Sequence, residues 1–390
     1  MRRLFCSMVI GAFLFVQGLS GAAEEQIGFR GMGAGLYPDA KPLVNWSPTS
    51  GVVWCTAMPD WSNASPVPVG KRIFVCAEPA TLVCVNADTG KIEWQDTVPD
   101  LPSPPPKAHQ ANGYTSATPC TDGKKIWAVF GQGVVACWEL SGKRLWSKTL
   151  EAPPNKEWGG CISPRLAAGK LIVQFDNLFG LDPSSGAILW KSKSPWGWGS
   201  PVVAKVGGVD VLYTCKGAVV DAATGKELMK GLPQLAYNSP CLVDGVLYYV
   251  QQPPGAFALP ESPAEKPSSL WTNITITDGR YYATPLVHDG LVYAVNQGQK
   301  LTVMDKKSGA VVYENNLNFL QKVAYPSPTL GGKHIFISSE GGQTVVIEPG
   351  REYKEVSRNT LEAFRSCPVF VGDRLYIRGL KNLWCIGPGN

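Results

Sequence analysis

Aromatic residues occupy one recurring position of this chain, a few residues before a small residue that is followed by proline. An indole or phenol ring can stack on the flat face of a sugar or a quinone, or become buried in the surface of a partner protein. The same rings could instead fill the seams between structural repeats, so both interpretations stay open. The residues at this position are Trp61, Tyr114, Trp158, Trp196 with Trp198, Tyr237, Tyr281 with Tyr282, Tyr325 and Phe364.

Three of these aromatic residues are the best placed to contact a ligand. Trp158, Trp196 and Trp198 are flanked by glycine, in Gly159-Gly160 and at positions 197 and 199. Glycine has no side chain to cover a neighbouring indole, so we expect these rings to be accessible.

Catalytic and metal-binding patterns are not indicated by the sequence. The chain has three histidines, His109, His288 and His334, and no two are close in sequence. The cysteines form no C-x-x-C, adjacent or haem-attachment pattern, and the serines form no nucleophile-elbow pattern. These observations favour a binding protein over a hydrolase or a metalloenzyme.

The small-residue–proline pair recurs eight times, at intervals of about 43 residues, which is a spacing typical of repeat architectures. The pairs are Ser65-Pro66, Thr118-Pro119, Ser163-Pro164, Ser200-Pro201, Ser239-Pro240, Thr284-Pro285, Ser327-Pro328 and Cys367-Pro368. Each pair starts a short apolar run, and turn residues separate that run from further β-prone runs. Four strands per repeat predict an all-β protein, an eight-bladed β-propeller of four-stranded antiparallel blades.

A glycine turn followed by an aromatic residue marks the junction between the third and fourth strands of many repeats. Examples are Thr89-Gly90 before Trp94 and Ser141-Gly142 before Trp146. Glycine supplies the positive φ that such a turn requires, and the tryptophan can pack between neighbouring blades.

The last repeat contains only three strands, at residues 368–371, 374–377 and 382–386. Residues 52–55 near the N-terminus form a further β-prone run that precedes the first repeat. We expect this run to complete the last blade and close the ring, because closure removes an exposed sheet edge.

Ten cysteines follow Cys6, an even number that permits disulfides in an exported protein. Most lie inside apolar runs, where a free cysteine behaves as a small core residue. Ring closure places Cys55 and Cys385 on neighbouring strands, so this pair is the first candidate for a disulfide.

The N-terminal residues resemble an export signal. Residues 1–23 combine Arg2-Arg3, an apolar stretch and small residues, which predicts a cleaved signal peptide and a periplasmic or secreted protein. Residues 24–45 are a glycine-rich lead-in, and residues 46–390 are the expected propeller. No later stretch has the length of a membrane span. The net charge of +5 is too small to indicate a nucleic-acid partner.

The Thr-Gly-Lys-x-x-Trp junction at residues 89–94 and the Ser-Pro strand starts resemble the PQQ-like (quinoprotein-type) β-propeller repeat family. Within that family, the length is similar to that of BamB-like exported proteins. The resemblance implies that the loops carrying the aromatic residues surround the mouth of a central channel, where quinoproteins bind their cofactor. Polar residues on the same loops include Asn238 and Arg280, and His109 and Arg365 are the first candidates among them. Sequence alone does not fix whether Arg165 points into the channel.

The resemblance implies two alternative functions. The first is an exported, non-catalytic, monomeric platform that binds a protein or carbohydrate partner through its aromatic rim and uses no cofactor. The second is a PQQ-dependent alcohol or sugar dehydrogenase, which would also bind calcium. The second is disfavoured because such enzymes are longer, and their insertions supply a calcium site, a catalytic aspartate and a pair of adjacent cysteines.

Overall fold

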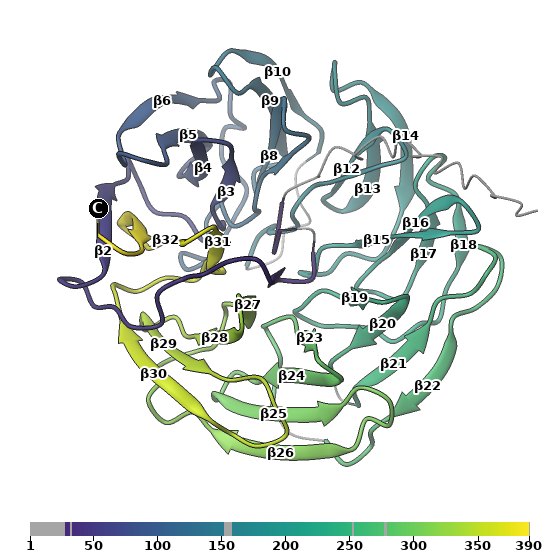
Figure 1. Ribbon diagram of the computed structural model, residues 1–390. Coiled ribbons are helices and arrows are strands. Elements are labelled where there is room, and N and C mark those ends of the chain that lie inside the picture. Colours follow the sequence, from purple (N-terminus) through teal and green to yellow (C-terminus); the bar gives the residue numbers. More distant parts are fainter. Residues whose placement is uncertain (1–27, 32, 152–157, 252, 277–278, 390) are drawn as a thin grey trace, which may run out of the picture.

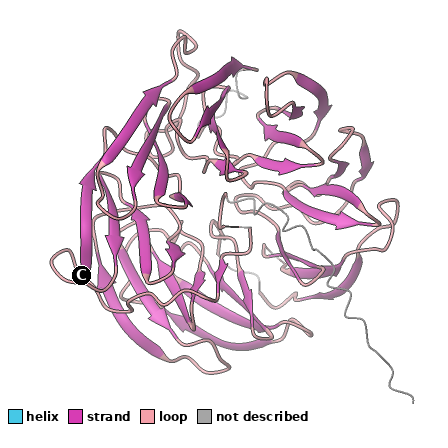
Figure 2. Ribbon diagram, turned by 45° about the horizontal axis from the view of Figure 1, so that its top comes forward, coloured by secondary structure: helices cyan, strands magenta, loops and turns pink. Residues whose placement is uncertain are grey.

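A computed structural model describes residues 28–31, 33–151, 158–251, 253–276 and 279–389. All regular secondary structure in these ranges is β-strand (Figure 2). The strands form eight sheets arranged as blades around a central axis (Figure 1), which confirms the predicted eight-bladed propeller. The described ranges contain no helix of the length and apolarity needed to span a membrane.

Every blade has four antiparallel strands, and seven of the blades are built from consecutive strands. From the innermost to the outermost strand, the first four blades are β3 (Val67–Val69), β4 (Arg72–Ala77), β5 (Thr81–Asn86) and β6 (Ile92–Thr97); β7 (Cys120–Thr121), β8 (Lys125–Phe130), β9 (Val134–Glu139) and β10 (Arg144–Thr149); β11 (Arg165–Ala167), β12 (Lys170–Gln174), β13 (Asn177–Leu181) and β14 (Ile188–Lys193); β15 (Val202–Val206), β16 (Val209–Tyr213), β17 (Val219–Asp221) and β18 (Glu227–Met229). The last four are β19 (Cys241–Val243), β20 (Val246–Tyr249), β21 (Gly255–Ala258) and β22 (Ser268–Thr272); β23 (Leu286–His288), β24 (Leu291–Val295), β25 (Lys300–Asp305) and β26 (Val311–Asn316); β27 (Thr329–Gly331), β28 (His334–Ser338), β29 (Gln343–Ile347) and β30 (Glu355–Thr360); β31 (Val369–Val371), β32 (Arg374–Arg378), β33 (Asn382–Ile386) and β2 (Val52–Ala57).

The burial of each strand explains its composition. The second and third strands of a blade are covered on both faces by neighbouring blades, so β4 and β5 are almost continuously apolar and buried. The outermost strand β6 instead alternates between exposed and half-buried residues, because one of its faces meets solvent.

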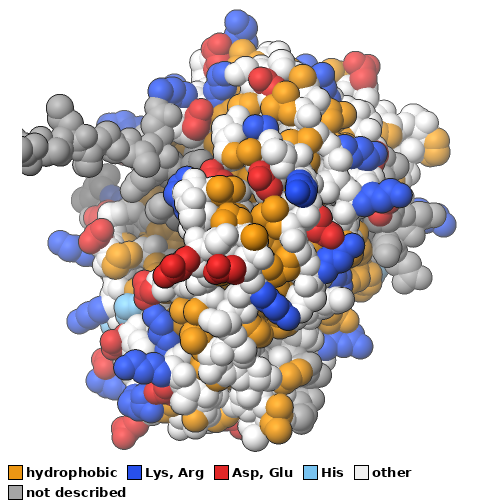
Figure 3. Space-filling view, turned by 90° about the vertical axis from the view of Figure 1, so that its right-hand side faces the viewer, with side chains coloured by type: hydrophobic (Ala, Val, Ile, Leu, Met, Phe, Trp, Pro, Cys, Tyr) orange, Lys and Arg blue, Asp and Glu red, His pale blue; other side chains and the backbone are white. Residues whose placement is uncertain are grey.

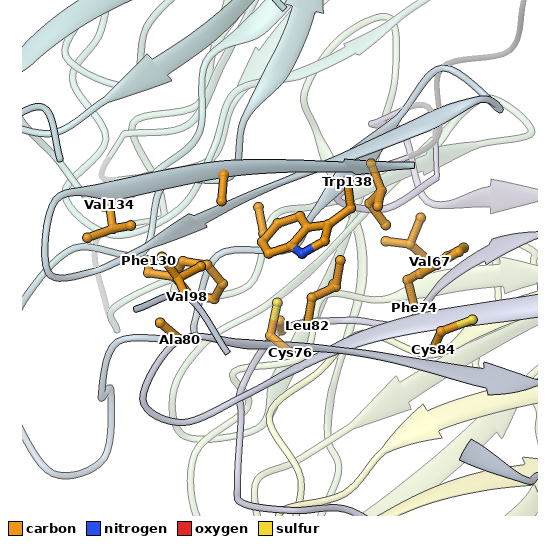
Figure 4. Close-up of a cluster of buried hydrophobic side chains, with 14 residues drawn as sticks. Val67, Phe74, Cys76, Ala80, Leu82, Cys84, Val98, Phe130, Val134 and Trp138 are labelled. Carbon is orange, nitrogen blue, oxygen red and sulfur yellow. The ribbon is translucent and has the colours of Figure 1, made fainter. Parts of the chain in front are cut away.

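The seams between blades hold most of the hydrophobic core. Figure 4 shows the seam of the first two blades, where Phe74 and Leu82 face Phe130 and Trp138. The indole N–H of Trp138 donates to a carboxylate oxygen of Asp96 at 2.7 Å, so this buried polar group is satisfied.

Tryptophan and glycine lock neighbouring blades together, as the repeated junction predicts. The Trp94 indole donates to the Leu140 carbonyl of the next blade, at 3.2 Å. The Trp54 ring covers Gly90, where an added Cβ would lie 2.7 Å from the indole, and the φ of Gly90 is +72°. A larger residue at Gly90 would therefore be strained and would collide with the docked ring.

Strand β2 closes the ring by pairing with β33, as predicted. Its Trp54 indole also donates to the Ala87 carbonyl of the first blade at 2.9 Å. The N-terminal strand thus completes the last blade and joins it to the first.

The predicted disulfide between Cys55 and Cys385 is absent from the structure. Both cysteines are free thiols, as are the other eight cysteines of the described residues. A bulge between Val52 and Trp54 sets the register so that Cys55 lies opposite Trp384 while Trp54 lies opposite Cys385. Successive side chains of a strand point to opposite faces, which leaves Cys55 exposed and Cys385 buried.

The described part of the lead-in crosses the ring from its centre to β2, as the purple chain in Figure 1 shows. Strand β1 (Leu36–Tyr37) pairs in parallel with the innermost strand β27. Beyond it, the Lys41 N–H donates to the Gly372 carbonyl at 2.7 Å, in the turn between β31 and β32. We call the face that carries these turns the lower face. The predicted signal peptide, residues 1–23, lies outside the described residues and stays a prediction.

The outer surface mixes charges of both signs. Figure 3 views the ring from one side, where Lys and Arg side chains are interspersed with Asp and Glu. Ion pairs such as Lys71–Asp88, at 3.1 Å between Nζ and Oδ2, contribute to this mixture.

Candidate functional site

A cavity of about 340 Å³ opens at the centre of the face opposite the lead-in, the upper face. Its walls come mainly from the loops that join the outermost strand of one blade to the innermost strand of the next. These loops also contact the turns between second and third strands, for example through the Asn238 amide N–H and the Val250 carbonyl at 3.0 Å. We call this cavity the well, and its volume is in the range of small-molecule sites.

The lead-in forms the floor of the well. Phe29 lines the cavity, and its backbone carbonyl accepts hydrogen bonds from both terminal nitrogens of Arg165, each at 3.3 Å. Arg165 therefore points into the channel. Arg30 lies alongside and donates to the Pro285 carbonyl at 3.0 Å and the Pro328 carbonyl at 3.1 Å. The chain thus closes the channel beneath the well.

The channel beneath the floor is positively charged. Burial lowers the pKa of the Arg165 guanidinium to about 10, and the nearby charge of Arg30 lowers it further in the same direction. At neutral pH Arg165 still carries its proton, so two cations, the buried Arg30 and the half-buried Arg165, lie under the well.

A closed belt of eight hydrogen bonds surrounds the axis at the level of the small-residue–proline pairs. In each blade, the N–H of the residue before proline donates to the side chain of the equivalent residue in the next blade. The distances run from 2.9 to 3.3 Å around the belt Ser65, Thr118, Ser163, Ser200, Ser239, Thr284, Ser327 and Cys367. The Cys367 N–H donates to Ser65 and closes the circle. This belt explains why the repeated residue is Ser or Thr in seven of the eight blades.

We expect Ser200→Ala to destabilise the protein measurably, because it removes the acceptor of the buried Ser163 N–H, which lies 2.9 Å away. An unsatisfied buried donor costs about 1–3 kcal/mol of unfolding free energy. Denaturant unfolding measures the loss, and Cys367→Ser serves as the control. That variant replaces a weak sulfur acceptor by a hydroxyl and should be at least as stable as the parent protein. Equal stability of Ser200→Ala and the parent would contradict the role of the belt.

Aromatic rings form a continuous arc along one side of the upper face. We call the aromatic arc the residues Trp196, Trp198, Tyr237, Tyr282 and Tyr325. Successive ring centroids lie 4.8, 5.6, 4.8 and 5.1 Å apart. These spacings are those of favourable aromatic pairs, so each ring holds its neighbour in place.

Arg280 lies against the aromatic arc. Its guanidinium carbon is 5.9 Å from the centre of the Tyr237 ring, which is cation–π range. A hydrogen bond with Tyr282 raises the pKa of Arg280. The charge is therefore permanent and lies exposed at the mouth of the well.

The other side of the well is formed by Trp158 and Arg365. Trp158 is 40 % exposed, and its ring stacks on His109 with centroids 3.8 Å apart. Arg365 is neutralised by Glu340, with Nη2 and Oε1 2.5 Å apart, and also donates to the Ala111 carbonyl at 2.8 Å. His109 and Arg365 thus both stabilise the loops that carry them, and Arg365 also lines the well.

The structure divides the predicted site residues into two groups. Trp158, Trp198, Tyr237, Tyr282, Tyr325 and Arg365 line the well. The lining does not include Trp61, Tyr114, Trp196 and His109. The Trp61 ring packs at Gly113, and the Tyr114 hydroxyl donates to the Pro106 carbonyl. Trp196 contacts the Trp198 ring, and His109 stacks on Trp158. Tyr281 and Phe364 are buried in the hydrophobic core, as the alternative of packing between repeats predicts.

Two parts of the site were missed from the sequence. Phe29 was not predicted to line the site, because its segment belongs to no repeat. The belt has a signal in the sequence, because one repeated position is restricted to Ser, Thr or Cys, a restriction that a strand start alone does not require.

Comparison with known proteins places this geometry in a family. Residues 37–160 and 174–387 match the family model described as outer membrane protein assembly factor BamB. The outer membrane protein assembly factor BamB of Moranella endobia (strain PCIT) is 22 % identical over 315 residues, covering 80 % of this chain and 68 % of that protein. A polyvinylalcohol dehydrogenase of a Pseudomonas species is 21 % identical over 337 residues, which cover 76 % of this chain and half of the enzyme.

Solved structures share the fold. The crystal structure of BamB from Moraxella catarrhalis superimposes with a TM-score of 0.64 at 14 % identity, covering 85 % of this chain and 98 % of that one. The quinohemoprotein alcohol dehydrogenase of Comamonas testosteroni gives a TM-score of 0.61 at 12 % identity, covering 90 % of this chain and 79 % of that one. Because the family model spans most of the sequence, the chain belongs to the family described as outer membrane protein assembly factor BamB.

Proposed function

We propose that this protein is an exported, non-catalytic binding platform whose upper face takes a protein partner in the cell envelope. The observation that carries the proposal is the aromatic arc beside the well, on the face that the lead-in leaves open. Aromatic residues dominate the energetics of protein interfaces, and here they are held in place by their neighbours. Membership of a family named for outer-membrane assembly supports an envelope partner.

The alternative, a PQQ-dependent alcohol or sugar dehydrogenase, is kept open by the dehydrogenases among the relatives. Calcium at such a cofactor requires several oxygen ligands, among them carboxylates. Among the described residues, no Asp, Glu or His lines the well, and none form a cluster of three His, Cys, Asp or Glu suited to a metal. The donor set of this well therefore does not fit PQQ with calcium.

We expect no binding and no turnover when the purified protein is mixed with PQQ and calcium. The test is thermal melting over a range of PQQ concentrations, followed by dye-coupled oxidation of alcohols and aldoses. A known quinoprotein dehydrogenase, treated in parallel, serves as the positive control. A saturable rise in melting temperature together with substrate-dependent dye reduction would establish the enzyme instead.

A further inference from the structure

The well offers hydrogen-bond donors that the protein itself does not use. Each of the seven belt hydroxyls, such as Ser200 and Ser239, accepts a backbone N–H, and each still has its own O–H hydrogen to donate. Among the described residues, none of these hydroxyls donates to a protein acceptor within hydrogen-bond distance. All seven line the well, so they present a ring of donors to whatever occupies it.

The well also contains a buried acceptor without a donor. The Asn238 side chain is 2 % exposed, and its amide nitrogen donates to the Val250 and Ala283 carbonyls at 3.0 and 3.2 Å. Its Oδ1 has no hydrogen-bond partner in the described structure. A ligand that both donates and accepts hydrogen bonds would satisfy Asn238 and the belt together, and sugar hydroxyls have this property.

The aromatic arc supplies apolar ring faces beside these polar groups, and its flattest part is the pair Trp198 and Tyr237. Trp198 stacks on Tyr237 with an interplanar angle of 27°, and Tyr237 is followed by Tyr282. A sugar ring has one face of C–H groups that packs against aromatic rings, whereas its edge carries the hydroxyls. The well therefore combines the two surfaces that a sugar residue requires.

The charge around the well is positive and is not balanced by its lining. Arg280 stands exposed at the mouth and forms no ion pair with any described residue. The half-buried Arg165 and the buried Arg30 lie under the floor, and their hydrogen bonds go to backbone carbonyls. Arg365 is compensated by Glu340, and the described residues of the lining include no carboxylate. This arrangement favours a ligand that carries negative charge.

We propose that the well binds an acidic sugar residue, a hexuronic acid at the end of a glycan chain. Its ring packs on the aromatic arc, its hydroxyls meet the belt and Asn238, and its carboxylate lies toward Arg280. The floor formed by Phe29 closes the channel, so the site accepts a chain end and not a chain passing through. A neutral sugar would leave the positive charge of Arg280 without a counter-charge, and a peptide carboxylate would not supply the several hydroxyls. The inference rests on the proposed function, because it assigns a ligand to the same upper face.

The test is isothermal titration calorimetry of the full mature chain with trigalacturonic acid and with its carboxyl-reduced, neutral counterpart. We expect saturable one-to-one binding of the acid, at least tenfold tighter than binding of the neutral trisaccharide. Arg280→Gln should abolish this preference, whereas Trp198→Ala should weaken both trisaccharides alike. The matched control is Arg351→Gln, because Arg351 is exposed and pairs with Asp305 far from the well.

Several results would overturn the proposal. The first two are equal affinity for the two trisaccharides and no detectable binding of trigalacturonic acid. The others are an identical effect of Arg351→Gln and Arg280→Gln on affinity, and binding of a tripeptide with a free carboxylate that is tighter than binding of trigalacturonic acid. Each variant must first show the cooperative melting of the parent protein. Partner capture that depends on the aromatic residues, without uronate binding, would overturn this inference and leave the proposed function standing. Uronate binding without partner capture would support this inference and overturn the proposed function.

Discussion

Deleting residues 24–56 should abolish cooperative unfolding and cause aggregation. The deletion removes the partner of β33, whose backbone groups then form an exposed sheet edge that can pair with other chains. It also removes Trp54, which docks on the first blade through Gly90 and Ala87. Truncating a buried tryptophan costs about 3–5 kcal/mol, and the half-buried Trp54 contributes part of that amount to the roughly 5–15 kcal/mol that stabilises a domain.

A shorter deletion separates ring closure from the other contacts of the lead-in. Removing residues 24–35 takes away Phe29 and Arg30 but keeps β1 and β2, so this variant should melt cooperatively at a lower temperature. Calorimetry and light scattering distinguish the two outcomes. An unchanged melting transition in the longer deletion would contradict closure by β2.

Replacing Trp158, Trp196 and Trp198 together with alanine should weaken partner capture far more than stability. Trp158 is 40 % exposed, Trp196 contacts Trp198, and Trp198 stacks on Tyr237. Truncation of one interface hot-spot residue costs about 2 kcal/mol or more, which is about a 30-fold loss of affinity. The melting temperature should change by only a few degrees, since no blade seam is opened.

The matched control is Trp94→Phe, a substitution in a seam tryptophan that bonds to Leu140 and covers Gly142. This variant should lose melting temperature while it retains partner capture below the transition. If instead the triple variant unfolds and conservative phenylalanine replacements leave capture intact, the three tryptophans serve packing and not binding.

The repeated parts of this protein were predictable because each repeat carries its own local signals. The pattern of Gly90 and Trp94 recurs in several blades, and there the tryptophan of one blade packs against the glycine of the next. The three-strand last repeat predicted the pairing of β2 with β33 for the same reason. Because every blade has four strands, counting the strands of the last repeat predicts that one strand must come from elsewhere in the chain.

The parts that escaped prediction depend on long-range placement or on register. Arg30 bonds to the carbonyls of Pro285 and Pro328, more than 250 residues away, and nothing in its own segment points to them. The Cys55–Cys385 pairing failed because one bulge shifts the register by a single residue. The aromatic positions were identified as a set, but only the three-dimensional structure separates Tyr282, in the well, from its buried neighbour Tyr281.

The central claim is that partners bind the upper face, and site-specific photocrosslinking in the native envelope tests it most directly. A benzophenone amino acid replaces Tyr282 beside the well in one variant and Val371 in another. Val371 is exposed next to the Gly372 turn of the lower face. The account predicts a discrete protein adduct from position 282, lost when Trp158, Trp196 and Trp198 are also replaced, and none from position 371. An adduct from position 371 with none from position 282 would contradict it.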